Sequence, residues 1–185
     1  TGGVINTKTK SGTNEFKAGA NFYWEPDSLR EQRDSSRNNK NGLYRIDNTR
    51  DEIDEWDVNV WASGALIEDE LFFYALFNPR SAENNYVGDQ TNTSSGVSQN
   101  GFFEKDDDAV WVAKLDWYVT ENNILEITAF SDERSTEITT YDSVDSGEFT
   151  DGRVGYEDWG GLNYTAKLTS IISDDFSISA QYVIN

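Results

Sequence analysis

The chain has 185 residues, of which 36% are hydrophobic and 14% aromatic, with no Cys, His or Met and a formal net charge of −19. The aromatic content argues against a disordered chain, and the missing His and Cys remove the usual general base, metal ligand and thiol nucleophile, so an enzyme is disfavoured. The charge disfavours duplex nucleic acid as a partner, because binding phosphates requires a basic face.

The first residues, GGVINTKTK, predict a short strand, which the turn KSGTN and the segment EFKAGANFYWE follow. In that segment Phe16, Ala18, Ala20, Phe22 and Trp24 fall on one parity. Such spacing is typical of a strand with one apolar face.

Three hairpins follow, and their tight polar turns lie near residues 68, 121 and 173, so the unit recurs about every 52 residues. The arms are EWDVNVWASGAL and LFFYALFNPR, AVWVAKLDWYV and ILEITAFSD, and WGGLNYTAKLTSI and FSISAQYVI. The polar connections 26–54, 81–107 and 132–157 show no recognisable strand pattern. We therefore expect long loops at one end of the sheet and tight turns at the other.

The hairpin arms alternate with a period of two, which predicts a sheet with one apolar and one polar face. The apolar positions are Trp56, Val58, Val60, Ala62, Gly64 and Leu66; Ala109, Trp111, Ala113, Leu115, Trp117 and Val119; Leu125, Ile127 and Ala129; Leu162, Tyr164, Ala166 and Leu168; and Phe176, Ile178, Ala180 and Tyr182.

A soluble sandwich would also alternate, but four features favour strands that cross a lipid bilayer. The strands are long, at about ten to twelve residues. Tight turns at one end and long loops at the other are typical of outer-membrane barrels. Aromatic residues gather near strand ends, and ionic residues lie on the polar face within the strands. These are Tyr23, Trp24, Trp56, Trp117, Tyr118 and Trp159, and Lys17, Lys114, Asp116, Glu126 and Lys167.

The run LFFYALF departs from this alternation, since Phe72, Tyr74 and Leu76 lie on the polar parity. Two interpretations stay open. The strand is buried on both faces, or it belongs to a barrel whose inner face packs against a plug.

The opening residues carry a resemblance to a known family. Gly2, Gly3, Val4, Ile5, Asn6, Thr9, Lys10, Ser11, Gly12, Thr13, Asn14 and Phe16 resemble the junction between plug and barrel in TonB-dependent outer-membrane receptors. GALIEDELFFYALFNPR and AKLDWYVTENNILEITAF are similar to hairpins of the Oar-like and carbohydrate or peptide uptake subgroups, although Asn123 and Ile124 stand where His and Arg are common.

The resemblance implies an all-β fold, an antiparallel up-and-down segment of about seven strands from a plugged barrel of the 22-stranded class. Residues 1–14 would end the plug and residues 15–185 would begin the barrel, so the chain is expected to be a fragment. The implied location is the outer membrane of a Gram-negative cell. The implied partners are outer-membrane lipid, an extracellular small molecule, glycan or peptide that is imported, and the TonB system through a missing N-terminal region.

Aromatic residues in the polar connections are candidate ligand-binding residues, because their rings could stack on sugars or on apolar peptide side chains. Packing of the connections against themselves explains the same residues. They are Tyr44, Tyr86, Phe102, Phe103, Tyr141 and Phe149.

Clustered carboxylates make calcium a possible cofactor, because Ca²⁺ takes oxygen ligands. The candidate ligands are Asp142, Asp145, Glu148 and Asp151, and a solvated acidic loop is the alternative. Arginines of the first connection could pair with the acidic connections or with lipopolysaccharide phosphates. These are Arg30, Arg33, Arg37, Arg45 and Arg50.

Two other functions remain open. A soluble propeller-like module that binds carbohydrate or protein would also repeat about every 50 residues, although a propeller blade has four short strands. A structural or adhesive surface barrel without a transport role is the other.

Overall fold

The computed structural model describes residues 9–94, 96–143 and 149–185, and these form β-strands with a single short 3-10 turn. The elements are β1 (Lys17–Glu25), η1 (Asp27–Leu29), β2 (Ser36–Arg37), β3 (Tyr44–Ile67), β4 (Leu71–Val87), β5 (Thr91–Thr93), β6 (Gly96–Thr120), β7 (Asn123–Ser131), β8 (Arg134–Ser143), β9 (Phe149–Trp159), β10 (Leu162–Ser173) and β11 (Phe176–Ile184).

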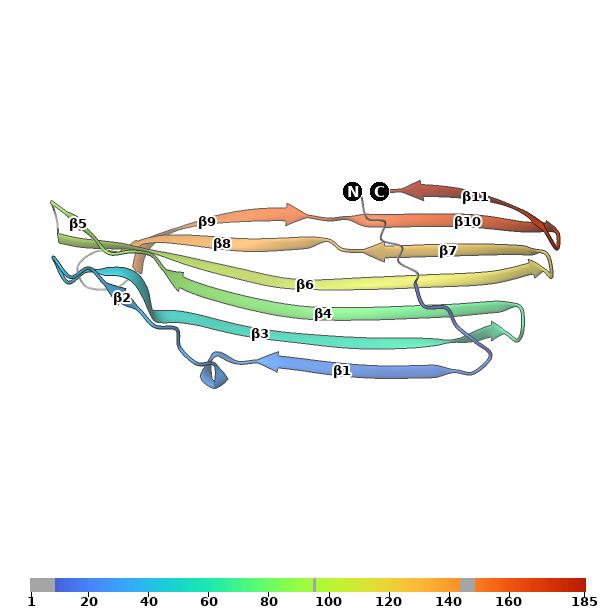
Figure 1. Ribbon diagram of the computed structural model, residues 1–185, viewed down its shortest axis with the longest axis horizontal. Helices are drawn as coiled ribbons and strands as arrows, with labels where there is room; N and C mark the ends of the chain where they lie inside the picture. Colours follow the sequence, from blue (N-terminus) through green and yellow to red (C-terminus); the bar gives the residue numbers. More distant parts are fainter. Residues whose placement is uncertain (1–8, 95, 144–148) are drawn as a thin grey trace.

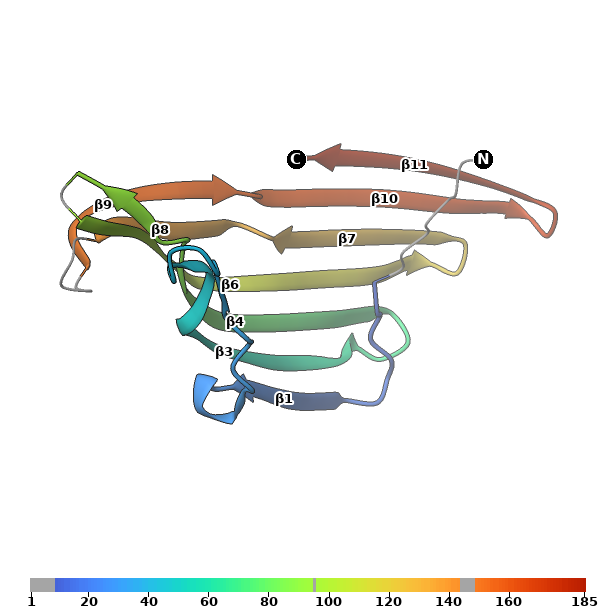
Figure 2. The same cartoon turned by 60° about the vertical axis from the view of Figure 1, so that its left-hand side comes forward.

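The described residues form one 11-stranded antiparallel sheet that is not closed (Figure 1). Its main path is β1-β3-β4-β6-β7-β10-β11, which keeps the sequence order and which Figure 2 shows from a second side. The strands off this path are β2, which pairs with β3, β5, which pairs with β6, and the pair β8 and β9. β8 follows β7 and pairs with the first half of β6, while β9 pairs with β8 and leads into β10. The expected all-β, up-and-down architecture is therefore confirmed. Closure into a barrel is not observed.

The predicted tight turns are confirmed, and all three lie at the same end of the sheet, here called the turn end (right in Figure 1). They connect β3 to β4, β6 to β7 and β10 to β11. In the first of them Asp69 has a φ of 59°, the left-handed conformation that Asp tolerates better than most residues.

The prediction that the polar connections lack strands is wrong. β3 begins at Tyr44, β4 continues to Val87, and β6 begins at Gly96, so these strands extend far beyond the predicted hairpin arms. β8 and β9 likewise fill most of the third connection. With 25 residues, β6 is about 80 Å long at ~3.3 Å per residue. We call the region beyond the predicted arms the extension end (left in Figure 1).

The physical reason for this error is that pairing in the extension end depends on the polar backbone ladder and on polar side-chain pairs rather than on an apolar face. Cross-strand partners there include Lys105 with both Glu83 and Glu137. Polar residues outnumber apolar ones on both faces of the extension end, and its aromatic residues lie on both faces, so hydrophobic alternation cannot reveal these strands.

The strand register places the predicted apolar positions on one face of the sheet. Val60 lies opposite Ala20 and Phe77, and Leu115 lies opposite Phe73 and Ile127. We call this side the outer face. The inner face is the opposite side, which carries the alternate residues, among them Lys17, Trp61, Tyr74, Lys114 and Lys167.

Burial in this sheet is inverted relative to a soluble protein. Among the described residues, the large apolar side chains that are buried are Tyr74 and Val87. The buried polar or charged residues are Asp47, Ser63, Asn78, Ser81, Gln99, Lys114, Asp116 and Ser131, while large apolar side chains of the outer face such as Val60 and Phe77 are exposed.

Candidate functional site

The outer face carries a band of exposed apolar side chains that ends in aromatic residues. In β3 the band runs from Trp56 to Leu66, and in β6 it reaches Trp117 at the turn end. Trp24 lies opposite Trp56 at the other border. Monomeric soluble proteins rarely expose an apolar patch of this extent, so the band is the first candidate functional surface.

The aromatic border slants across the strands. Through the register, Trp111 lies in the row of Val60, Tyr164 in the row of Ala62, and Tyr182 in the row of Gly64. The border at Tyr182 of β11 therefore lies eight residues further along the strands than the border at Trp56 of β3. Passing from β3 to β11 takes five steps between neighbouring strands, so the border shifts by about 1.6 residues per strand. With ~3.3 Å per residue and ~4.8 Å between strands, a level border requires strands tilted by about 45°.

This tilt makes the dimensions of the band comparable with those of a membrane. Ten residue steps separate Trp56 from Leu66, which is ~33 Å along the strand and about 23 Å in height at a tilt of 45°. Transmembrane β-barrels carry an outward apolar band of ~25 Å between aromatic girdles, on strands tilted by ~35–45°.

The inner face carries an ion network behind the band. The Nζ of Lys114 lies 2.8 Å from Asp116 Oδ1 and 3.5 Å from Glu126 Oε1, and the Nζ of Lys167 lies 3.2 Å from Glu126 Oε2. The side chains of Lys114 and Asp116 are only 5% and 9% exposed. The four charges balance, which is what burial of ions requires.

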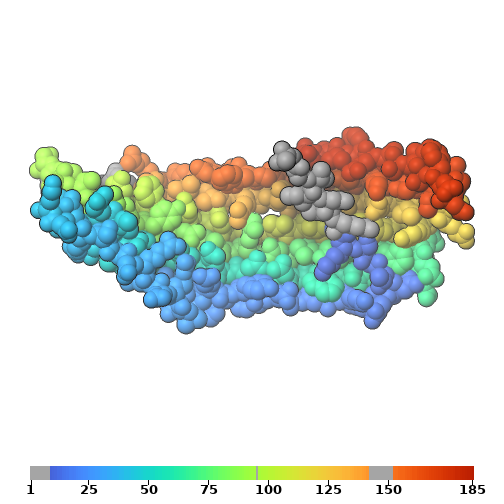
Figure 3. All heavy atoms as spheres, in the orientation of Figure 1, coloured from blue at the N-terminus to red at the C-terminus, as the bar shows by residue number. Residues whose placement is uncertain are grey.

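Residues 9–14, here called the N-terminal segment, lie across this inner face, over β3, β4 and β6 (Figure 3). Ser11 Oγ accepts a hydrogen bond of 2.8 Å from Lys114 Nζ, and Lys10 Nζ lies 5.5 Å from the centre of the Trp61 ring. Asn14 exchanges two hydrogen bonds with Asp69 in the β3–β4 turn. The short strand expected over residues 2–10 lies largely outside the described residues, and Thr9 and Lys10 are not in a strand.

The segment also explains the departure of LFFYALF from alternation. Tyr74 is buried and lines a cavity of about 270 Å³ together with Lys10, Ser11 and Thr13. Phe72 lines a neighbouring cavity with Ser11 to Asn14. Two of the three apolar residues on the inner parity, Phe72 and Tyr74, therefore lie beside the N-terminal segment.

A larger cavity, of about 520 Å³, lies where the apolar band meets the extension end, and we call it the Arg80 cavity. Two arginines and several carboxylates line it: Arg80, Arg134, Glu25, Glu55, Asp57 and Asp106, beside Tyr23 and Asn84. The adjacent Asp108 side chain is 7% exposed, accepts a hydrogen bond from Ser135 N, and lies 3.9 Å from Arg134 Nε.

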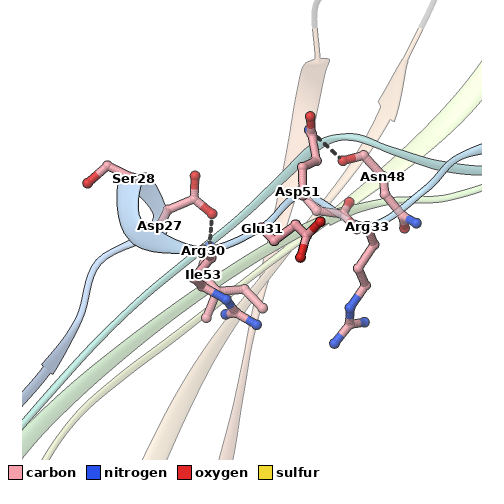
Figure 4. A pocket seen from close by; sticks show the side chains of 9 residues that line it. Asp27, Ser28, Arg30, Glu31, Arg33, Asn48, Asp51 and Ile53 are labelled. Carbon is pink, nitrogen blue, oxygen red and sulfur yellow. Dashed lines mark hydrogen bonds between the residues drawn. The ribbon is translucent and has the colours of Figure 1, made fainter.

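A second cavity, of about 320 Å³, forms where the first connection folds back on β3 (Figure 4). The connection is held there because Asp27 Oδ1 accepts a hydrogen bond from Ile53 N and Asp54 Oδ1 accepts one from Asp27 N. Burial raises the pKa of Asp51 in this cavity, with a further contribution from Asp47, against the opposing effects of Val87 N–H and Arg33.

The predicted aromatic residues form two pairs on opposite faces. Tyr86 stacks on Phe102 at 6.1 Å on the inner face, while Phe103 lies 4.9 Å from Tyr141 on the outer face. The Tyr44 ring lies under the Arg37 guanidinium at 3.7 Å. Phe149 begins β9. The six residues therefore do not meet in one site.

The inner aromatic pair has an unusual phenol. Burial, a hydrogen bond to Glu104 and the charge of that carboxylate together raise the pKa of Tyr86 to about 12. Nearby, burial would raise the pKa of Asp47, but hydrogen bonds from Thr49 and Gln99 outweigh it and lower the pKa.

The calcium prediction falls mostly outside the part of the chain that the structure describes. Asp145 and Glu148 are not among the described residues, and Asp142 and Asp151 lie in β8 and β9. Within the described ranges, no three His, Cys, Asp or Glu side chains are grouped so that they could hold a metal ion.

Some first-connection arginines have partners within the chain. Arg30 Nε lies 3.4 Å from Glu25 Oε1, and Arg37 donates a hydrogen bond to Gly42 O. The Arg80 cavity was missed, because its residues come from five different strands and acquire a shared location only through the register. One sequence signal is available. Arg80 and Asp106 have even residue numbers, like the inner-face residues Tyr74 of β4 and Lys114 of β6, so continued alternation along these strands would place them on the inner face.

No protein-family model, curated protein or solved structure matches the chain. Among the described residues, no helix is long and apolar enough to cross a bilayer.

Proposed function

We propose that the chain is part of a TonB-dependent receptor in the outer membrane of a Gram-negative cell. The observation that carries the proposal is the inverted sheet, with an exposed apolar band on the outer face whose aromatic border slants by about 1.6 residues per strand from β3 to β11. Lipid is the partner that such a band fits, because a tilted strand crosses the hydrocarbon layer in about ten residues.

Burial on the inner face supports lipid rather than a second protein layer on the outer face. A soluble sandwich would bury apolar side chains between two sheets and leave polar ones in water. Here Val60 is 48% exposed, whereas Lys114 on the opposite face is 5% exposed. A propeller fits less well, because the described residues form one continuous sheet rather than separate four-stranded blades.

A transport role is supported by what covers the inner face. The segment Lys10–Asn14 lies against the inner face of the sheet. By the resemblance, this segment would be the end of a plug. The open edges β1 and β11 require further strands, since an unpaired strand edge is not tolerated in hydrocarbon.

The Arg80 cavity is our candidate for substrate contact. Four carboxylates and two arginines line it, so a neutral or cationic ligand rich in hydroxyl or amine groups fits its charge better than a polyanion. A glycan or a basic peptide has this chemistry. The ligand would reach the cavity from the extension end, along the inner face of the sheet.

The test is to express the complete reading frame that encodes the chain in a Gram-negative host. We expect the product in the outer-membrane fraction, with heat-modifiable mobility, and cross-linked to TonB in energised cells. Recovery from the soluble fraction would contradict the proposal. An outer-membrane product that never cross-links to TonB would instead identify a surface barrel without a transport role.

A further inference from the structure

The contacts of the N-terminal segment differ along its length. At Asn14 the contact is a closed pair of hydrogen bonds, since Nδ2 donates to Asp69 Oδ1 at 2.6 Å and Oδ1 accepts from Asp69 N at 2.9 Å. Toward the N-terminus each polar contact is single: Ser11 accepts one hydrogen bond from Lys114, and Lys10 Nζ lies 5.5 Å from the centre of the Trp61 ring. Between them Gly12 packs on the backbone of Gly64 and Phe73, whose carbonyl oxygens a Cβ at position 12 would meet. The segment is therefore fixed at Asn14 and held less firmly at Ser11.

The Lys114 ammonium uses all three of its donors in this arrangement. They point to Ser11 Oγ, Asp116 Oδ1 and Glu126 Oε1. Asp116 Oδ2 has no hydrogen-bond partner, although the side chain is 91% buried. An acceptor is therefore vacant next to a cation whose third donor is occupied by a residue of the N-terminal segment.

We propose that residues 10–13 form a strap that can leave the inner face while Asn14 stays hydrogen-bonded to Asp69. When Ser11 leaves, Asp116 Oδ2 becomes the alternative acceptor for the third donor of Lys114. The exchange keeps the charges of the network balanced, so neither state leaves a buried ammonium with an unused donor. Asn14 and Asp69 then act as the hinge. The contacts themselves do not depend on the proposed receptor function, but the role of the strap as the releasable end of a plug rests on it.

The chain has no Cys, so pairs of introduced cysteines can be spin-labelled cleanly. The test measures the distance distribution between labels at Thr9→Cys and Glu121→Cys in the complete protein. A second pair, Phe16→Cys and Glu121→Cys, reports the other side of the hinge. The variants are Ser11→Ala, Ser11→Ala with Asp116→Asn, and Ser179→Ala, which removes an exposed inner-face hydroxyl on β11 away from the strap.

Ser11→Ala should raise the ratio of displaced to docked strap by about tenfold or more, as expected when a hydrogen bond to a charged group is lost. Adding Asp116→Asn should reverse much of this increase, because an amide nitrogen cannot accept the third donor of Lys114 in the displaced state. Ser179→Ala should match the wild type. The pair at Phe16 should keep one narrow distance in every variant.

An unchanged distribution in Ser11→Ala would overturn the proposal. So would a double variant that is displaced as much as Ser11→Ala or more, which would mean that Asp116 only supports the docked state. Loss of the narrow distance at Phe16 would contradict the hinge. Circular dichroism of each variant establishes that the sheet is intact. If the protein proved not to be an outer-membrane receptor, the distances would still report the strap, so the two proposals fail separately.

Discussion

Trp24 of β1 lies directly opposite Trp56 of β3, and both indole side chains are exposed on the outer face at the border of the apolar band. Amphipathic rings favour the level of the lipid headgroups. Trp61 is five residues further along β3 than Trp56, so it lies on the inner face, beside Lys10.

These positions predict the response to quenching by brominated lipids in vesicles. Lipids brominated near the headgroup should quench the fluorescence of Trp56 strongly, so Trp56→Phe should remove a strongly quenched component of the emission. Trp61→Phe is the matched control, and it should remove fluorescence that the lipid quenches weakly. Equal quenching of both components would contradict the assignment of the faces.

Lys105 is the cation of an acidic cross-strand ladder on the outer face of the extension end. Its Nζ lies 2.8 Å from Glu83 Oε1 and 3.2 Å from Asp107 Oδ2. Hydrogen bonds to Glu83 and then Asp107 raise the pKa of Lys105. A hydrogen bond from Ser81 outweighs burial and, together with Lys105, lowers the pKa of Asp107.

Lys105→Met should therefore loosen the extension end, because it leaves carboxylates facing each other across the strands. Limited proteolysis should cleave the β4 and β6 extensions faster than in the wild type, and salt should reduce the difference because these charges are exposed. Lys40→Met removes the same charge from a turn and should have little effect. In the wild type, the ionised Asp107 carboxylate contributes to the stability of the folded protein at neutral pH. This contribution is lost as the pH falls through the lowered pKa of Asp107.

The phenol of Tyr86 should titrate late. Its pKa in the folded protein is about 12, above the ordinary tyrosine value of 10.0, so the stability it contributes is complete below pH ~10 and disappears as the pH rises through ~12. An ultraviolet titration should show a tyrosinate step at high pH that Tyr86→Phe removes. Titration of every tyrosine near pH 10 would contradict the contact with Glu104.

The β9–β10 junction requires glycine at position 160. Gly160 has a φ of +74°, and a Cβ there would collide with the backbone carbonyl of Asp132. The Asp132 side chain also accepts a hydrogen bond of 3.1 Å from Gly161 N, which couples this junction to the one between β7 and β8.

Gly160→Ala should lower the free energy of unfolding by about 1–3 kcal/mol, the typical cost of strained backbone. Gly155→Ala is the matched control, because no atom lies within 4 Å of its Cβ position and its φ is not in the positive range. Denaturant titration of the two variants compares them directly. Equal destabilisation would refute the role of the positive φ.

The sequence was sufficient to predict the band and the turns. Alternation from Trp56 to Leu66 and from Phe176 to Tyr182 predicts strands with an apolar face, and the register confirms that these residues share it. The connections at residues 68–70, 121–122 and 174–175 were likewise expected to be tight. These features depend on local patterns, which a single sequence contains.

The extension end and the cavities could not be predicted in this way. Phe102 and Phe103 are adjacent, so they face opposite sides of β6, but this matters only once residues 96–108 are known to form a strand. The Arg80 cavity depends on the register between β1, β3, β4, β6 and β8, which is set by long-range pairing rather than by local composition.

The most direct test of the central claim, that the outer face contacts lipid, compares Val60→Arg with Asn59→Arg in the complete protein reconstituted into vesicles. The two residues are adjacent in the middle of the β3 band and lie on opposite faces. Reversible unfolding should show that Val60→Arg lowers the free energy of unfolding by about 2–4 kcal/mol, the usual cost of Arg near the bilayer midplane, whereas Asn59→Arg changes it little. Equal effects at the two positions, or a tolerated Val60→Arg, would contradict the claim.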